Sequence, residues 1–303
     1  MSYTDSVNGF WAALTGIAGT IGHAKGGFVA AAVILETGSM LLQAFRWRLL
    51  LRSLRSGATA WDTLLAYAAG VCVSNVTPAR AIGGDAARAA LIPRPGGSPP
   101  VSAIAASVVY DRATEIAGVL LLAAIAMPAL RLQSPYWLPV AVLLALCATF
   151  VARPMFGRLA ARVAARHRAI VGRDMRAAMA KAVGCSLMVW LLDISRIMLV
   201  GAAFDVRLTP SQAASFTLLR LGGGIAPVPG GIGIVDGALI AGFMWLGLPK
   251  ETAAALALVE RGIVYGWNTA LGAVALLLLG GTRALNNARA ESAAVDVAAE
   301  SGT

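Results

Sequence analysis

Charged residues are scarce in this sequence of 303 residues, since only 13% are Asp, Glu, Lys or Arg whereas 58% are hydrophobic. Soluble domains carry about 25% charged and about 45–50% apolar residues, so the composition excludes an ordinary soluble protein. Several apolar stretches reach the roughly 20 residues that a helix needs to cross a bilayer. The sequence therefore predicts an all-α, polytopic integral membrane protein.

Residues that commonly catalyse reactions or hold metals are also rare. The two histidines, His23 and His167, lie outside the long apolar stretches, so they form no histidine-based phosphatase or metal motif. No Walker A sequence occurs, which argues against direct pumping by ATP hydrolysis. The three cysteines lack metal-binding spacing and indicate buried, unreactive thiols: Cys72, Cys147 and Cys185. We therefore expect no enzyme activity, no catalytic residue, no cofactor and no metal.

Neither end of the chain reads as a folded soluble domain. Residues 1–27 lack a basic segment before their apolar part, so we expect no cleavable signal peptide but an interfacial helix or a weak first span. Residues 281–303 are polar and predict a disordered cytoplasmic tail. Between them we expect one transmembrane domain, which consists of a first half (28–152), a basic cytoplasmic loop (153–181) and a second half (182–280).

The net charge of +10 comes mainly from two basic segments, residues 46–55 and 153–181. Lys and Arg in short loops favour the cytoplasmic side, which places both segments and the C-terminus inside the cytoplasmic membrane. The second segment predicts an amphipathic helix on the anionic inner leaflet. Neither segment alternates basic with aromatic residues, so we expect no nucleic-acid partner.

Two apolar segments are interrupted by glycine and proline, residues 61–92 and 211–246. If both basic segments and the C-terminus lie on the cytoplasmic side, the chain must cross the membrane an even number of times from each of them to the next. This requirement is met only if each interrupted segment enters the membrane and returns to the side from which it came. We therefore predict two re-entrant helical hairpins that open to opposite faces, as in an inverted repeat. Five uninterrupted spans accompany them: 28–45, 101–127, 138–151, 182–204 and 252–280.

The two halves also repeat a pattern of charges. In the first half Asp85 follows the interruption, and Asp111-Arg112 comes 26 positions after it. In the second half Asp236 follows the interruption, and Glu260-Arg261 comes 24 positions after it. Interrupted segments at corresponding places in two halves indicate a transporter binding site near the membrane midplane.

Physical chemistry suggests how such a site would bind an anion. Interrupted helices expose backbone N–H groups and positive dipole ends, which are tolerated in a membrane only around a cavity or inside protein. Arg112 and Arg261 are the first candidates for clamping an anionic headgroup, since guanidinium matches phosphate bidentately. The further candidates flank the interruptions: Asn75, Pro78, Gly83, Gly84, Asp85, Arg88, Asp111, Arg220, Pro229, Gly230, Gly231, Gly233, Asp236 and Glu260.

Plainer explanations exist for several of these residues. Glycines in membrane helices often serve only close packing. Arg112 could pair with Asp111 or Glu115 for structural reasons alone. Asp193 and Arg196, three positions apart, predict a structural ion pair. Glu36 stands isolated in the first span, where proton coupling is one use for it.

Four stretches together resemble the lysylphosphatidylglycerol synthase transmembrane-domain family of flippase-like membrane proteins: "SNVTPARAIGGDAARAALI", "YDRATE", "APVPGGIGIVDG" and "ERGIVYG". The resemblance covers residues 28–280, and its most specific part is Pro-Gly-Gly-x-Gly with an acid three residues later. The family more often has Glu where this chain has Asp236, which keeps the carboxylate but shortens its reach. The resemblance implies movement of a lipid or lipid-linked headgroup. In multidomain members a soluble aminoacyl-transferase domain follows, and we expect none here because the chain ends soon after the last span.

The leading hypothesis is a flippase that moves an anionic lipid or lipid-linked headgroup across the cytoplasmic membrane. The alternatives are an ion-coupled carrier of a small soluble anion and a membrane scaffold that binds lipid-biosynthesis enzymes. A membrane transferase that uses only carboxylates, namely Asp85, Asp111 or Asp236, is a weaker alternative. The intramembrane acids leave proton coupling open as an energy source.

Overall fold

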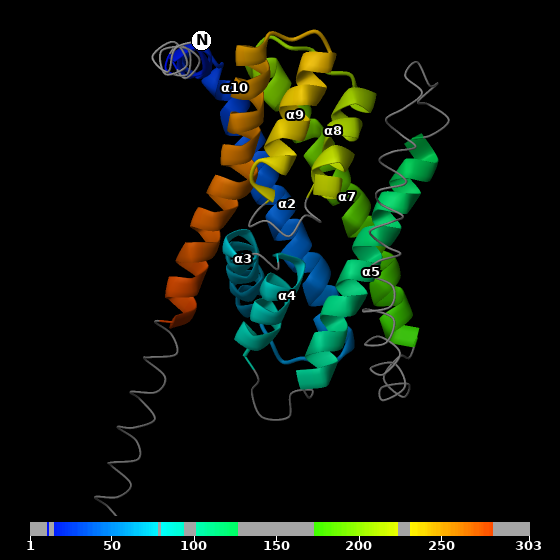
Figure 1. Ribbon diagram of the computed structural model, residues 1–303. Helices are drawn as coiled ribbons and strands as arrows, with labels where there is room; N and C mark the ends of the chain where they lie inside the picture. The colour runs from blue at the N-terminus through cyan, green and yellow to red at the C-terminus, as the bar shows by residue number, and fades with distance from the viewer. Residues whose placement is uncertain are drawn as a thin grey trace, which may run out of the picture.

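The computed structural model describes residue 11 and residues 15–77, 80–93, 101–126, 173–223 and 231–280. Within these ranges the chain forms helices and turns and no strand (Figure 1). Three helices are long and apolar enough to cross a membrane: Gly26–Ser53, Asp174–Ala203 and Lys250–Gly280. The prediction of an all-α polytopic membrane protein is confirmed.

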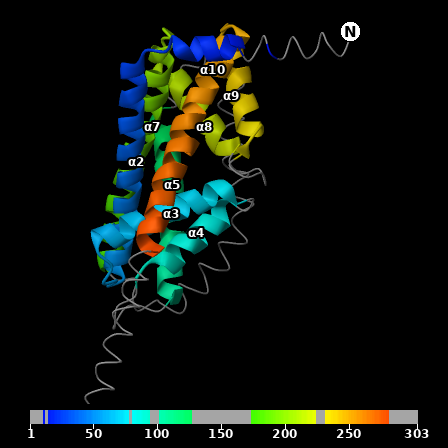
Figure 2. The same ribbon diagram turned by 90° about the vertical axis from the view of Figure 1, so that its left-hand side faces the viewer.

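Two long helices run side by side through the molecule, α2 (Gly26–Ser53) and α7 (Arg173–Ala203) (Figures 1 and 2). At 1.5 Å per residue, the 28 residues of α2 give about 42 Å, more than the ~30 Å hydrocarbon core. They are antiparallel, because an ion pair joins Lys25 before α2 to Asp205 after α7. The remaining helices pack around this pair.

Both long helices extend further than the sequence predicted. The first span was expected to end at residue 45, but α2 continues to Ser53 and places Arg46 inside the protein, where it is 1% exposed. The assignment of Arg46 to a cytoplasmic loop was therefore wrong. Likewise, residues 173–181 of the expected basic loop form the first turns of α7. The charge of Arg46 does not end α2, because other helices supply buried hydrogen-bond partners for its guanidinium.

Each interrupted segment folds into a pair of short helices. The first contains α3 (Ala60–Val76) and α4 (Arg80–Leu91), and the second contains α8 (Pro210–Gly223) and α9 (Ile234–Trp245). These helices have 12–17 residues, or about 18–26 Å, too short to cross a ~30 Å core. The two hairpins enter from opposite ends of the bundle (Figure 1). Re-entrant placement in a membrane and the inverted repeat stay predictions.

Equivalent features begin the two hairpins. Arg55 after α2 and Asp205 after α7 both have positive φ, at 58° and 60°. Four residues beyond each, a threonine caps the next helix: the Thr59 hydroxyl accepts the Asp62 N–H at 3.1 Å, and the Thr209 hydroxyl accepts the Gln212 N–H at 3.3 Å. The two helix ends and the two caps each lie 150 residues apart. These matches support a repeat that begins with the two long helices.

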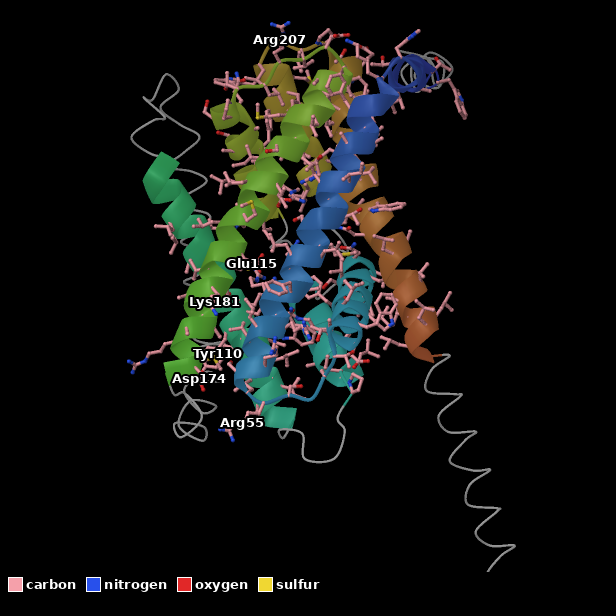
Figure 3. The ribbon with its side chains drawn as sticks, turned by 180° about the vertical axis from the view of Figure 1, so that it is seen from behind. Arg55, Tyr110, Glu115, Asp174, Lys181 and Arg207 are labelled. Atoms are coloured by element: carbon pink, nitrogen blue, oxygen red, sulfur yellow. The ribbon has the colours of Figure 1, made fainter. Side chains whose placement is uncertain are left out.

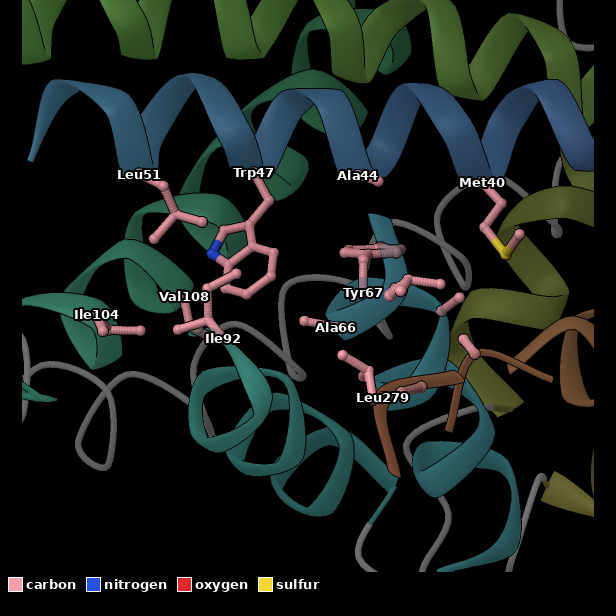
Figure 4. Close-up of a cluster of buried hydrophobic side chains, with 14 residues drawn as sticks. Met40, Ala44, Trp47, Leu51, Ala66, Tyr67, Ile92, Ile104, Val108 and Leu279 are labelled. Atoms are coloured by element: carbon pink, nitrogen blue, oxygen red, sulfur yellow. The ribbon is translucent and has the colours of Figure 1, made fainter. Parts of the chain in front are cut away.

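Each hairpin packs on its own hydrophobic core. The first core joins α2, α3 and α5 (Val101–Ala126), with Trp47, Tyr67 and Ile104 among its members (Figure 4). The second core joins α2, α7, α8, α9 and α10 (Lys250–Arg261), and Phe216 and Phe243 stack in it at 4.2 Å between ring centroids. Residues of α2 and of the last long helix belong to both cores, so these two helices connect the two hairpins.

The last long helix is not regular throughout. After α10 a π-helical turn, η2 (Gly262–Trp267), precedes the regular helix that ends at Gly280. At the other end of the chain, residues 15–22 are helical and lie across one end of the bundle (Figure 2). The predicted span 138–151, the loop residues 153–172 and the tail 281–303 lie outside the described residues.

Candidate functional site

Charged side chains inside the bundle form two clusters, one beside each hairpin. At the centre of the first, Asp111 on α5 is fully buried and accepts hydrogen bonds from Arg46 Nε on α2 and Arg88 Nη1 on α4, each at 2.8 Å. The Arg88 guanidinium also lies 4.9 Å from the Trp47 ring centre and 5.2 Å from that of Tyr67. This centre joins three helices and is closed to solvent, and the predicted role of Asp111 and Arg88 in binding substrate stays a prediction.

The edge of this first cluster is more open. Arg112 on α5 is 34% exposed, and its guanidinium makes a two-pronged contact with Asp85 on α4. Arg112 Nε lies 2.9 Å from Asp85 Oδ2, Nη2 lies 2.9 Å from Oδ1, and Nη1 lies 2.8 Å from Glu115 Oε2. Arginine binds phosphate with the same two-pronged geometry. The predicted anion-binding arginine is thus held by a carboxylate of the hairpin.

At the centre of the second cluster, Arg196 on α7 is fully buried among carboxylates. Its Nε lies 2.8 Å from Glu36 Oε2 on α2, and Nη1 donates to Glu260 Oε1 on α10. Its Nη2 lies 3.6 Å from Asp193, whose other oxygen accepts a hydrogen bond from Arg220 at 2.9 Å. The predicted ion pair between Asp193 and Arg196 is confirmed. The view of Glu36 as an isolated acid was wrong, because its partner lies on another helix.

The edge of the second cluster is formed by Arg261 and Asp236. Arg261 Nη1 lies 3.0 Å from Asp236 Oδ1, and its guanidinium carbon lies 3.8 Å from the Tyr265 ring centre. Asp236 Oδ2 accepts the N–H of Gly233, the residue before α9, at 2.9 Å. Gly233 has φ +83°, and a Cβ there would meet nothing within 4 Å. Among the residues that the structure describes, the space beside Gly233 is therefore open at the N-terminal end of α9.

The predicted glycines of the first hairpin serve packing. A Cβ on Gly84 would lie 1.9 Å from the Ser74 hydroxyl oxygen, and one on Gly83 would lie 2.7 Å from that of Thr77. Both glycines therefore let α4 contact α3, as the plainer explanation proposed. Asn75 binds the last helix, donating to the Thr269 hydroxyl at 2.9 Å. Gly231, which precedes α9, has φ +68°. Three predicted residues lie outside the described residues: Pro78, Pro229 and Gly230.

The two buried arginines of α2 and α7 make reciprocal contacts. Arg46 of α2 donates to the Ser186 hydroxyl of α7 at 3.0 Å, while Arg196 of α7 contacts Glu36 of α2. Positions 46 and 196, and positions 36 and 186, are each 150 residues apart. Each arginine also binds an acid that directly precedes a cluster-edge arginine, Asp111 or Glu260. The sequence predicted Asp111 and Glu260 as site residues but missed their partners Arg46 and Arg196, although the shared spacing of 150 was a signal.

The chemistry open to these clusters is anion binding and proton exchange. The hydrogen bonds, ion pairs and ring contacts described above involve carboxylates, guanidiniums, amides, hydroxyls and aromatic rings. Among the residues that the structure describes, no group of three or more His, Cys, Asp or Glu is arranged to hold a metal ion. Each carboxylate of the clusters already contacts an arginine, whose positive charge repels a metal cation.

A model of the family described as the lysylphosphatidylglycerol synthase transmembrane region matches residues 6–272. Two curated relatives from Methanothermobacter thermautotrophicus, each called a UPF0104 membrane protein, are similar over shorter stretches. One is 34% identical over 96 residues, which are 31% of this chain and 28% of the relative. The other is 37% identical over 90 residues, which are 29% of this chain and 27% of the relative. The match thus spans less than a third of either relative, and no solved structure matches.

Proposed function

Because the chain belongs to the family of the lysylphosphatidylglycerol synthase transmembrane region, we propose that it moves an anionic lipid or lipid-linked headgroup across the cytoplasmic membrane. The observation that carries this proposal is the pair of matched contacts Arg112–Asp85 and Arg261–Asp236. Each contact joins the second helix of a hairpin to the next long helix. Both lie at the more exposed edge of a buried cluster.

In this proposal, a headgroup phosphate replaces the hairpin carboxylate on the arginine. The fork between Arg112 and Asp85 has the geometry that phosphate requires, so exchange needs no rearrangement of the arginine. Releasing Asp85 loosens α4 from α5, and releasing Asp236 loosens α9 from α10. Headgroup binding at one edge therefore frees one hairpin while the other stays closed, which is the requirement of alternating access.

The second edge offers an additional anion contact. The N-terminal end of α9 carries partial positive charge, and Gly233 leaves space beside it. Arg261 lies on the neighbouring helix and contacts Asp236 in the first turn of α9. A phosphate that displaces Asp236 would meet the guanidinium and the Gly233 N–H together. The acyl chains stay in lipid, beside the apolar side chains that the long helices leave exposed.

The charge at the two ends of the bundle supports the proposed orientation. Toward one end lie Arg55 and Lys181, and toward the other lies Arg207 (Figure 3). Among the described residues, the first end exposes four cations and one acid: Arg52, Arg55, Arg176, Lys181 and Asp174. The second end exposes three cations and two acids: Lys25, Arg207, Lys250, Asp205 and Glu251. The larger excess of Lys and Arg over acids at the first end favours this end as the cytoplasmic one. The last described helix, which ends at Gly280, also ends there.

The experiment that tests this function is mass spectrometry of lipids that co-purify in mild detergent. Wild type is expected to retain one anionic lipid class above its bulk proportion. Arg112→Ala should lose this lipid, whereas Asp85→Asn should retain more of it because the arginine fork is freed. Arg207→Ala, an exposed arginine at the end of the bundle, is the matched control and should behave as wild type.

Each outcome decides between the hypotheses. Opposite effects of the Arg112 and Asp85 variants, with monodisperse protein in both, would support headgroup binding at the fork. Equal lipid retention in all four proteins would refute it. Binding of inorganic phosphate without any retained lipid would instead favour a carrier of a small soluble anion.

A further inference from the structure

The two clusters differ in their charge balance. The first contains three arginines and three carboxylates: Arg46, Arg88, Arg112, Asp85, Asp111 and Glu115. The second contains three arginines and four carboxylates: Arg196, Arg220, Arg261, Glu36, Asp193, Asp236 and Glu260. Counted over the residues that the structure describes and with every group ionised, the first cluster is neutral and the second has one excess negative charge. Excess charge inside a membrane protein is costly unless a counter-ion or a proton neutralises it.

The excess carboxylate is identified by the reciprocal contacts of α2 and α7. Where Arg46 contacts the neutral Ser186, Arg196 contacts Glu36. Glu36 is 4% exposed, so neither a headgroup nor a hydrated ion reaches it. The groups that face it from the packed elements are Asp193 and Arg196 on α7, Arg220 on α8, Glu260 on α10, and Asn268 after η2. Among these described groups the cations are Arg196 and Arg220, and both are already included in the charge balance of the second cluster.

A second observation concerns Asn268, which is 8% exposed. Its Nδ2 lies 2.5 Å from Glu36 Oε1, and its Oδ1 has no hydrogen-bond partner. The two ends of an amide are assigned from the hydrogen bonds around them, and the opposite assignment turns Oδ1 toward Glu36. A proton on Glu36 Oε1 then donates to Asn268 Oδ1. Protonation thus removes the excess charge and gives the buried amide oxygen a donor, in exchange for the N–H that Nδ2 donates to Glu36 in the ionised form.

We propose that Glu36 is a proton-binding residue, and that Arg196, Asn268 and Glu260 form the site around it. A proton fits this site better than a metal ion, because Arg196 contacts both glutamates and leaves no set of carboxylate oxygens for a metal. The proton reaches bulk solvent through the carboxylate of Asp193, which is 10% exposed, while Arg220 holds that carboxylate in place at 2.9 Å. The idea that this proton drives lipid movement rests on the function proposed above. The proposal that Glu36 binds a proton does not depend on that function.

Infrared difference spectroscopy on the full-length protein tests proton binding without any transport step. Wild type at neutral pH should show the C=O band of a buried protonated carboxyl, which shifts on exchange into D₂O. Glu36→Gln should abolish this band. Glu251→Gln, an exposed glutamate at the end of the bundle, should keep it. Replacing KCl by NaCl should leave the band unchanged.

A second variant keeps the test decisive if Glu36→Gln fails to fold. Asp193→Asn changes a residue that contacts Arg196 and Arg220 but not Glu36, and it leaves three carboxylates for three arginines, so the band should disappear there too. A wild type without a protonated-carboxyl band overturns the proposal, as does a band that persists in both variants. Loss of the band in NaCl would show that a metal cation binds instead. A positive result stands even if no lipid is moved.

Discussion

Replacing Asp111 with asparagine should destabilise the protein strongly. Asp111 neutralises two buried arginines, Arg46 and Arg88, and is itself fully buried. Asparagine fills the same volume but removes the carboxylate that both guanidiniums share. Arg46 keeps Glu115 at 3.5 Å and Arg88 keeps Asp85 at 3.0 Å, but the cluster is left with three arginines and two carboxylates, which is one excess positive charge. Breaking a buried ion pair by removing one partner costs about 3–5 kcal/mol, a large share of the roughly 5–15 kcal/mol that stabilises a folded domain.

The matched change in the second cluster should cost much less. Glu260→Gln removes the equivalent acid, but Arg196 keeps Glu36 and Asp193 as partners. The cluster then contains three arginines and three carboxylates, so no excess charge arises. We therefore expect Glu260→Gln to cost about 2 kcal/mol less than Asp111→Asn, the difference between a lost ion pair and a lost hydrogen bond to a charged group.

Thermal unfolding in detergent, followed by fluorescence-detected size exclusion, measures this difference. At about 2–4 °C per kcal/mol, Asp111→Asn should lower the apparent Tm by roughly 6–20 °C. Glu260→Gln should lower it by only a few degrees. Equal shifts in the two variants, or a shift of only one or two degrees in Asp111→Asn, would refute the charge balance derived from the structure.

Three other changes test separate contacts. Gly84→Ala should destabilise the first hairpin by about 1–3 kcal/mol or more, because the added methyl group overpacks against α3. Gly237→Ala is the control, since a Cβ there meets nothing within 4 Å. Equal Tm values for the two variants would contradict this account of the packing. Arg112→Lys should lose roughly tenfold in retained lipid, because lysine cannot form a two-pronged contact; unchanged retention would leave a simple charge requirement. Glu36→Gln should make lipid movement in liposomes insensitive to an imposed pH gradient, and undiminished sensitivity would separate the proton site from transport.

The sequence identified the elements that depend on local signals. Glycine and proline in residues 61–92 and 211–246 predicted two interrupted segments, and each folds into two helices. The similar spacing from Asp85 to Arg112 and from Asp236 to Arg261, 27 and 25 positions, singled out residues that the fold brings into contact, at 2.9 Å and 3.0 Å. These inferences succeeded because helix breakers act locally and because an isolated intramembrane charge needs a partner.

The centres of the clusters were not predictable in the same way. Arg46 stands in a run of basic residues, which is typical of a cytoplasmic loop, and its burial depends on Asp111, 65 positions away. Glu36 has no charged neighbour in the sequence, and its partner Arg196 comes from α7. Such contacts are set by how α2 packs against α5 and α7. Only the spacing of 150 residues between Arg46 and Arg196 hinted at them.

The measurement that tests the central claim most directly is lipid translocation in liposomes that contain the purified protein. A fluorescent anionic lipid is placed in both leaflets, and a membrane-impermeant reductant bleaches the outer one. Wild type should expose the inner pool to bleaching, whereas the double variant Arg112→Ala/Arg261→Ala should leave it protected. Equal bleaching by wild type and a folded double variant would contradict the account.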